Sequence, residues 1–87
     1  MNRQQIGQQL RAILAIVNEE LAQREDISEN TAIREGLGLD SLQLAELLFE
    51  VEEKFGVKIP DEQAQRLRTV RELVDIIEAK EGKNTRG

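Results

Sequence analysis

The chain has 87 residues, of which 39% are hydrophobic and 33% charged, a composition that fits one soluble domain with a single core. Its net charge of −5 is carried by residues 40–62, where seven acidic side chains stand against two lysines. This excess disfavours nucleic-acid or anionic-membrane partners and favours partners with basic patches. Cysteine and histidine are absent, which excludes thiolate and imidazole metal sites and makes autonomous catalysis unexpected.

An amphipathic helix is predicted for the first part of the chain. Apolar residues recur at spacings of three and four over residues 6–21, without a proline, and indicate about five turns. Residues 23–39 lose this pattern and carry turn and capping residues, so we expect a long loop. Ile27, Ile33 and Leu37 should pin that loop onto the helices.

A second helix is predicted over residues 41–55. Asp40 can accept backbone N–H bonds as its N-cap, and Gln43 completes a pair similar to a capping box. Gly56 is placed to end this helix, because glycine adopts the left-handed conformation of a C-cap without strain.

Two further helices are expected after it. Pro60 suits the beginning of a short helix over residues 61–67. Thr69 and Glu72 have the spacing of a capping box, and an apolar stripe predicts a fourth helix over residues 70–80. Residues 81–87 contain no apolar side chain and are expected to form a flexible tail.

These elements define an all-α fold. Three longer helices, one short third helix and a long loop between the first two helices indicate a small four-helix bundle. We assign residues 1–80 to this domain. No apolar run reaches the roughly 18 residues of a membrane span, and the polar N-terminus lacks the features of a secretory signal, so a cytoplasmic location is expected.

The second helix has two apolar faces where burial requires one. The face expected in the core comprises Leu44, Leu47, Leu48, Val51 and Phe55. Leu42, Ala45 and Phe49 fall on a different arc beside Glu46 and Glu53, so we interpret this second face as an exposed docking surface. Burial of Leu42 and Phe49 under the long loop is the alternative.

The chain resembles the acyl carrier protein family, in register over about residues 6 to 80. The residues that carry the resemblance are Ile33, Leu37-Gly38-Leu39-Asp40-Ser41-Leu42, Glu46-Leu47, Glu52-Glu53, Phe55, Ile59-Pro60-Asp61 and Thr69-Val70. The resemblance implies that Ser41 is esterified with 4'-phosphopantetheine, whose thiol carries acyl groups as thioesters between enzymes of fatty acid, lipid or polyketide biosynthesis. No catalytic residue of its own is implied, because the reactive sulfur belongs to the cofactor.

The resemblance also implies two sets of binding residues. Those expected to meet a phosphopantetheinyl transferase and acyl-processing enzymes are Asp40, Leu42, Ala45, Glu46, Phe49, Glu52 and Glu53. Those expected to line a space for the acyl chain are Val51, Phe55, Ile59, Ala64 and Leu67, for which ordinary core packing is a compatible alternative. A monomer is expected.

The pathway and the load are left open by departures from the family pattern. Gly36, Gln43, Ala45 and Phe49 stand where carriers of fatty acid synthesis usually have other residues. The Leu-Asp pair before Ser41 favours an acyl over a peptidyl load. A peptidyl or aminoacyl carrier and a cofactor-free helical adaptor that binds partners through the second helix are the alternatives.

Overall fold

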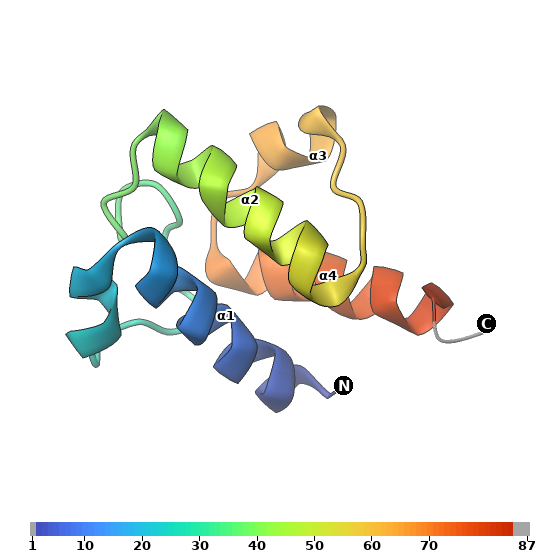
Figure 1. Ribbon diagram of the computed structural model, residues 1–87, viewed down its shortest axis with the longest axis horizontal. Helices are drawn as coiled ribbons and strands as arrows, with labels where there is room; N and C mark the ends of the chain where they lie inside the picture. Colours follow the sequence, from blue (N-terminus) through green and yellow to red (C-terminus); the bar gives the residue numbers. More distant parts are fainter. Residues whose placement is uncertain (1, 85–87) are drawn as a thin grey trace.

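Residues 2–84 are described by a computed structural model, and α-helices account for most of them (Figure 1). The elements are α1 (Arg3–Val17), the 3₁₀ helix η1 (Glu19–Gln23), α2 (Ser41–Phe55), α3 (Asp61–Arg66) and α4 (Val70–Asn84). Ala32 and Thr69 form a single antiparallel bridge, and the described residues contain no β-strand. The predicted all-α fold with three longer helices, a short third helix and a long loop is confirmed.

The first helix is shorter than predicted. It begins at a capping box formed by Asn2 and Gln5 and ends at Val17 rather than continuing to residue 21. Asn18 is extended, and its side chain accepts the backbone N–H of Glu20 at 3.1 Å, which starts η1. An asparagine side chain that bonds to nearby backbone in this way competes with helix continuation.

The predicted bounds of the second helix are confirmed. Asp40 Oδ1 accepts the backbone N–H of Gln43 at 2.7 Å, and Gln43 Oε1 accepts the backbone N–H of Asp40 at 3.3 Å. At the other end Gly56 adopts the left-handed conformation, with φ at +66°, and its N–H bonds to the Glu52 carbonyl.

The last two helices differ from the prediction at their C-terminal ends. Pro60 precedes α3, which covers Asp61–Arg66. The Thr69 and Glu72 capping box is present, with distances of 3.2 and 3.4 Å. The fourth helix continues to residue 84 rather than ending near residue 80, because each added residue extends the helical backbone ladder without a proline. The flexibility expected of residues 81–87 stays a prediction. Residues 85–87 of the predicted tail lie outside the described residues.

The core lies between α1, α2 and α4 and is completed by the loop between η1 and α2 (Figure 1). Ile33 and Leu37 of this loop are 1% and 3% exposed, and Ile27 packs half-buried against the core. The Ile33 N–H also donates to the Arg68 carbonyl at 2.8 Å. The loop is therefore fixed to the bundle, as predicted, by apolar burial and by backbone hydrogen bonds.

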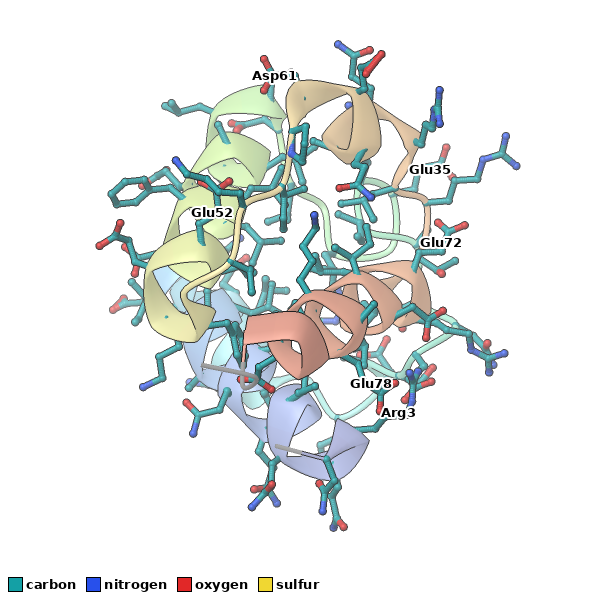
Figure 2. All side chains as sticks on the ribbon, turned by 90° about the vertical axis from the view of Figure 1, so that its right-hand side faces the viewer. Arg3, Glu35, Glu52, Asp61, Glu72 and Glu78 are labelled. Atoms are coloured by element: carbon teal, nitrogen blue, oxygen red, sulfur yellow. The ribbon has the colours of Figure 1, made fainter. Side chains whose placement is uncertain are left out.

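Ion pairs join segments of the fold that are distant in sequence. Arg3 contacts Asp75 at 2.6 Å and Glu29 and Glu78 at 3.0 Å each, and Figure 2 shows it beside Glu78. Hydrogen bonds from Arg3 to Asp75, Glu29 and Glu78 raise the pKa of its guanidinium above the ordinary value. This cluster ties α1 to α4 and to the loop at the protein surface.

A second arginine fastens the beginning of the loop. Arg24 donates two hydrogen bonds to the Asp26 carboxylate, at 2.8 and 2.9 Å, and one to the Gly36 carbonyl at 2.6 Å. The hydrogen bonds from Arg24 lower the pKa of the Asp26 carboxyl. Arg11 of α1 in turn donates to the backbone carbonyl of Arg24. These bonds connect the beginning of the loop to α1 and to the segment around Gly36.

Two glycines should respond oppositely to substitution by alanine. In Gly36→Ala the new Cβ would lie 2.6 Å from the Ala32 carbonyl oxygen, so we expect a loss of about 1–3 kcal/mol of unfolding free energy. Gly7 is exposed within α1, and a Cβ added there would meet nothing within 4 Å, so Gly7→Ala should gain about 0.5–1 kcal/mol. Urea unfolding followed by circular dichroism measures both values, and equal effects would contradict this account.

Candidate functional site

Ser41 is the first residue of α2 and is exposed. Its hydroxyl has no hydrogen-bond partner within the described part of the chain, and the Asp40 capping box fixes the turn that presents it. The first backbone N–H groups of a helix lack intrahelical acceptors, and the helix dipole is positive there. An anionic group esterified to this hydroxyl would therefore be stabilised by the start of α2.

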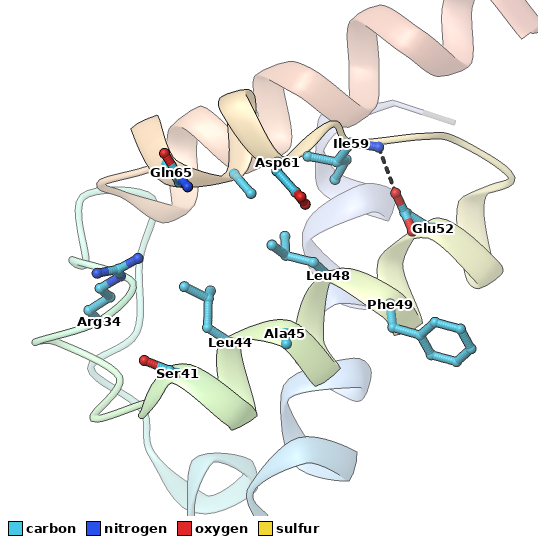
Figure 3. Close-up of a pocket in the computed structure, with 11 residues that line it drawn as sticks. Arg34, Ser41, Leu44, Ala45, Leu48, Phe49, Glu52, Ile59, Asp61 and Gln65 are labelled. Atoms are coloured by element: carbon cyan, nitrogen blue, oxygen red, sulfur yellow. Dashed lines mark hydrogen bonds between the residues drawn. The ribbon is translucent and has the colours of Figure 1, made fainter.

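A groove of about 450 Å³ lies between α2 and α3 and includes Ser41 in its lining (Figure 3). The residues that line it are Arg34, Ser41, Leu44, Ala45, Leu48, Phe49, Glu52, Ile59, Asp61, Ala64 and Gln65. Leu44, Leu48, Ile59 and Ala64 give it an apolar interior. Such a surface can receive an apolar chain that is attached near the start of α2.

Three charged residues line the groove: Asp61 at the start of α3, and Arg34 and Glu52 toward the two ends of the groove. Arg34 lies at the same end as Ser41, and Glu52 lies at the opposite end (Figure 3). The Glu52 carboxylate accepts the backbone N–H of Ile59 at 2.7 Å, which ties the segment before α3 to α2. The α2 wall of the groove is thus apolar in its middle and polar toward its ends.

The five residues expected to line an acyl space all belong to the core cluster or pack against it, and two of them also face the groove. Ile59 and Ala64 line the groove. Val51, Phe55 and Leu67 do not line this groove but are 0%, 7% and 8% exposed in the core, and their expected role beside an acyl chain stays a prediction. Burial on the core side of α2 and at the end of α3 turns these three away from the groove.

Sequence reasoning missed two apolar groove residues, Leu44 and Leu48. The predicted core stripe of α2 includes both, and Leu44 is indeed buried, but Leu48 is half-buried because it lies on the side of α2 that faces α3. Their spacing of four residues places both on one side of the helix. The position of α3, which the spacing alone does not reveal, decides that this side lines a groove.

The second apolar face of α2 is exposed. Leu42 and Phe49 are 70% and 58% exposed, which excludes their burial under the loop. Ala45, Glu46 and Glu53 are exposed on the same helix, so the apolar strip has carboxylates beside it. We refer to Leu42, Ala45, Glu46, Phe49 and Glu53 as the α2 outer face.

Two residues expected to meet partners lie next to this face. Asp40 is exposed, but its carboxylate accepts the Gln43 N–H in the capping box. Glu52 is half-buried, lines the groove and is engaged by the Ile59 N–H, so its carboxylate is less available than those of Glu46 and Glu53.

The described residues contain neither a candidate metal site nor a candidate membrane-spanning helix. Residues 2–84 hold no group of three or more His, Cys, Asp or Glu side chains that could bind a metal ion. Within the same residues, no helix is long and apolar enough to cross a membrane.

Comparison with known proteins identifies the class to which this site belongs. The family described as "Phosphopantetheine attachment site" matches residues 11–77. The chain is 41% identical to an acyl carrier protein of Rubrobacter xylanophilus over 78 residues, which cover 88% of this chain and 93% of the relative. It is 38% identical to an acyl carrier protein of Thermosynechococcus vestitus over 80 residues, which cover 92% and 96% of the two chains.

A solved structure shows the same fold. The acyl carrier protein of Thermotoga maritima superimposes with a TM-score of 0.78 at 27% identity, over 95% of this chain and 94% of that one. The chain belongs to the phosphopantetheine-binding family. A covalent 4'-phosphopantetheine is its cofactor, and that group supplies the thiol on which a load is held as a thioester. The Ser41 hydroxyl, which has no hydrogen-bond partner within the described residues, and the apolar groove next to it fit such a group.

The α2 outer face should contribute little to stability, since its side chains are already in water. We expect Leu42→Ala and Phe49→Ala to change the unfolding free energy by about 0.5 kcal/mol or less. Leu47→Ala, at a residue 1% exposed on the opposite side of α2, should cost about 2–5 kcal/mol. Urea unfolding of the three variants compares them directly, and a large loss in either outer-face variant would show that this face is packed.

Proposed function

We propose that Ser41 is the residue to which the 4'-phosphopantetheine is attached. The protein acts as an acyl carrier: it holds acyl groups as thioesters for acyl-processing enzymes and is not itself an enzyme. The observation that carries the assignment to Ser41 is its exposed, unbonded hydroxyl at the start of α2, in the lining of an apolar groove. Ser28, the other serine of the chain, lies in the loop, where its hydroxyl accepts the Asn30 N–H at 3.2 Å.

The side chains around Ser41 have separate tasks in this proposal. Asp40 fixes the turn that presents the hydroxyl, and the start of α2 stabilises the phosphodiester. Leu44, Leu48 and Ile59 offer the load an apolar surface that excludes water from it. During attachment Ser41 Oγ loses its proton and forms a bond to the coenzyme A phosphorus that bears the pantetheine. The pyrophosphate bond of coenzyme A breaks, and adenosine 3',5'-bisphosphate leaves.

Partner enzymes should dock on the α2 outer face. Leu42 and Phe49 offer exposed apolar area, and Glu46 and Glu53 offer charge complementary to basic patches. Charge steering speeds encounter, and a small apolar contact keeps residence short, as repeated exchange between enzymes requires. We further propose that the carrier is monomeric, since its core closes within one chain, and that it works in the cytoplasm.

Fatty acid biosynthesis is the pathway we propose. Two relatives that match most of the chain are acyl carrier proteins, which disfavours a peptidyl or aminoacyl load. A cofactor-free adaptor is disfavoured by the match to a phosphopantetheine attachment family. A polyketide or other specialised lipid pathway is the alternative, because Gln43, Ala45 and Phe49 depart from the residues usual in carriers of fatty acid synthesis.

Attachment is tested by the intact mass of the protein after incubation with coenzyme A and a phosphopantetheinyl transferase. We expect the wild type and Ser28→Ala to gain one phosphopantetheinyl group and Ser41→Ala to gain none. The exposed position of Ser41 predicts an unchanged helical circular dichroism spectrum for Ser41→Ala. A mass gain in that variant would place the attachment site elsewhere.

Docking is tested by charge reversal on the α2 outer face. For Glu46→Lys with Glu53→Lys, kcat/KM for the transferase should fall by roughly tenfold or more at low salt, and the deficit should shrink as salt screens the charges. Glu19→Lys with Glu25→Lys is the matched control, because both carboxylates are exposed and lie outside residues 40–62. Equal losses in the two double variants would argue against a localised docking face.

A further inference from the structure

Arg34 is the cation of the groove that contains Ser41. It lies in the loop before α2, is exposed, and lines the groove together with Ser41 and Gln65. Figure 3 shows Arg34 and Ser41 at the same end of the groove, away from the Asp61 and Glu52 carboxylates. The groove is therefore lined by a positive charge at the end where the hydroxyl lies, although the chain as a whole is negative.

Three other arginines of the protein surface have carboxylate partners. Arg3 contacts three carboxylates, Arg24 is bonded to Asp26, and Arg71 lies 3.5 Å from Glu29. Arg34, like Arg11, Arg66 and Arg68, forms no ion pair within the described part of the chain, and of these four arginines only Arg34 lines the groove that contains Ser41. A guanidinium offers five donors in a planar fork that matches the oxygens of a phosphate group, and no carboxylate of the described residues claims those of Arg34.

We propose that Arg34 binds the phosphodiester that links the cofactor to Ser41 and so directs the arm into the groove between α2 and α3. This inference rests on the proposed attachment at Ser41. An ester at Ser41 Oγ places anionic oxygens directly beyond the serine, at the groove end that Arg34 lines. Two charge-assisted hydrogen bonds from one guanidinium would restrict the rotation of the arm at its root.

A carboxylate on the acyl load is the other source of the same anionic chemistry. The load is attached to the thiol at the far end of the arm, whereas the phosphodiester is fixed beside Ser41. Proximity along the chain therefore favours the phosphodiester. In this arrangement Arg34 is a positioning residue: it takes no part in forming or breaking the thioester, and its effect is on where the arm lies.

The test compares apo and holo protein by NMR, with the holo form made by a phosphopantetheinyl transferase and confirmed by intact mass. We expect the Arg34 Nε–Hε resonance to shift on conversion from apo to holo. The shift should shrink by roughly half or more between about 20 mM and about 0.5 M salt, because the pair is exposed. The ³¹P resonance of the holo protein should move in Arg34→Ala and return toward the wild-type position in Arg34→Lys.

Arg66→Ala is the matched control, because Arg66 is exposed on α3 and lies outside this groove, and its substitution removes the same charge. The ³¹P resonance of this variant should match that of the wild type. An Arg34 signal that does not move in fully modified protein would overturn the inference while leaving attachment at Ser41 intact. Absence of modification would instead remove the proposed function.

Loaded forms separate the two sources of negative charge. Butanoyl and malonyl holo proteins should show the same Arg34 shift if the phosphodiester is bound. A shift that appears only with the malonyl carboxylate would assign Arg34 to the load and overturn the inference. The wild-type Arg34 signal decides between these outcomes even if a substitution at residue 34 impairs folding.

Discussion

The capping box of Asp40 and Gln43 is the constraint on which the site depends. By fixing where α2 begins, it also fixes which way each later residue of the helix faces, because successive residues advance by about 100°. Leu47 and Val51 consequently enter the core, Leu42 and Phe49 face water, and Leu48 faces α3. One local pair of hydrogen bonds thus determines three surfaces of a single helix.

The loop before α2 keeps this start in place. Ile33 and Leu37 are buried, and the Ile33 N–H bonds to the Arg68 carbonyl, so the loop is attached to the connection between α3 and α4. Arg24 adds a bond to the Gly36 carbonyl from the other side. For the proposed attachment at Ser41, the position of the hydroxyl must be fixed in the free protein, and these contacts fix it before any partner binds.

Much of this fold could be predicted from the sequence because the signals are local. The bounds of α2 follow from Asp40 and Gly56, whose roles depend on neighbours a few residues away. The sequence does not predict the helix break at Asn18, because the helical periodicity continues to Leu21. It does not predict the lining of the groove either, because that lining depends on the placement of α3. Arg34 has no periodic signal in a loop, and only the fold brings it to the groove of Ser41.

The short helix α3 has a consequence for the size of acyl group that the groove could receive under the proposed function. Its six residues include no buried side chain, and it is joined to the bundle chiefly through the buried Ile59 and Leu67 at its ends. Local opening costs little where little apolar surface is exposed by it. We therefore expect the α3 wall of the groove to move more readily than the α2 wall, so the groove could widen by a shift of one short helix without a change in the proposed docking face on α2.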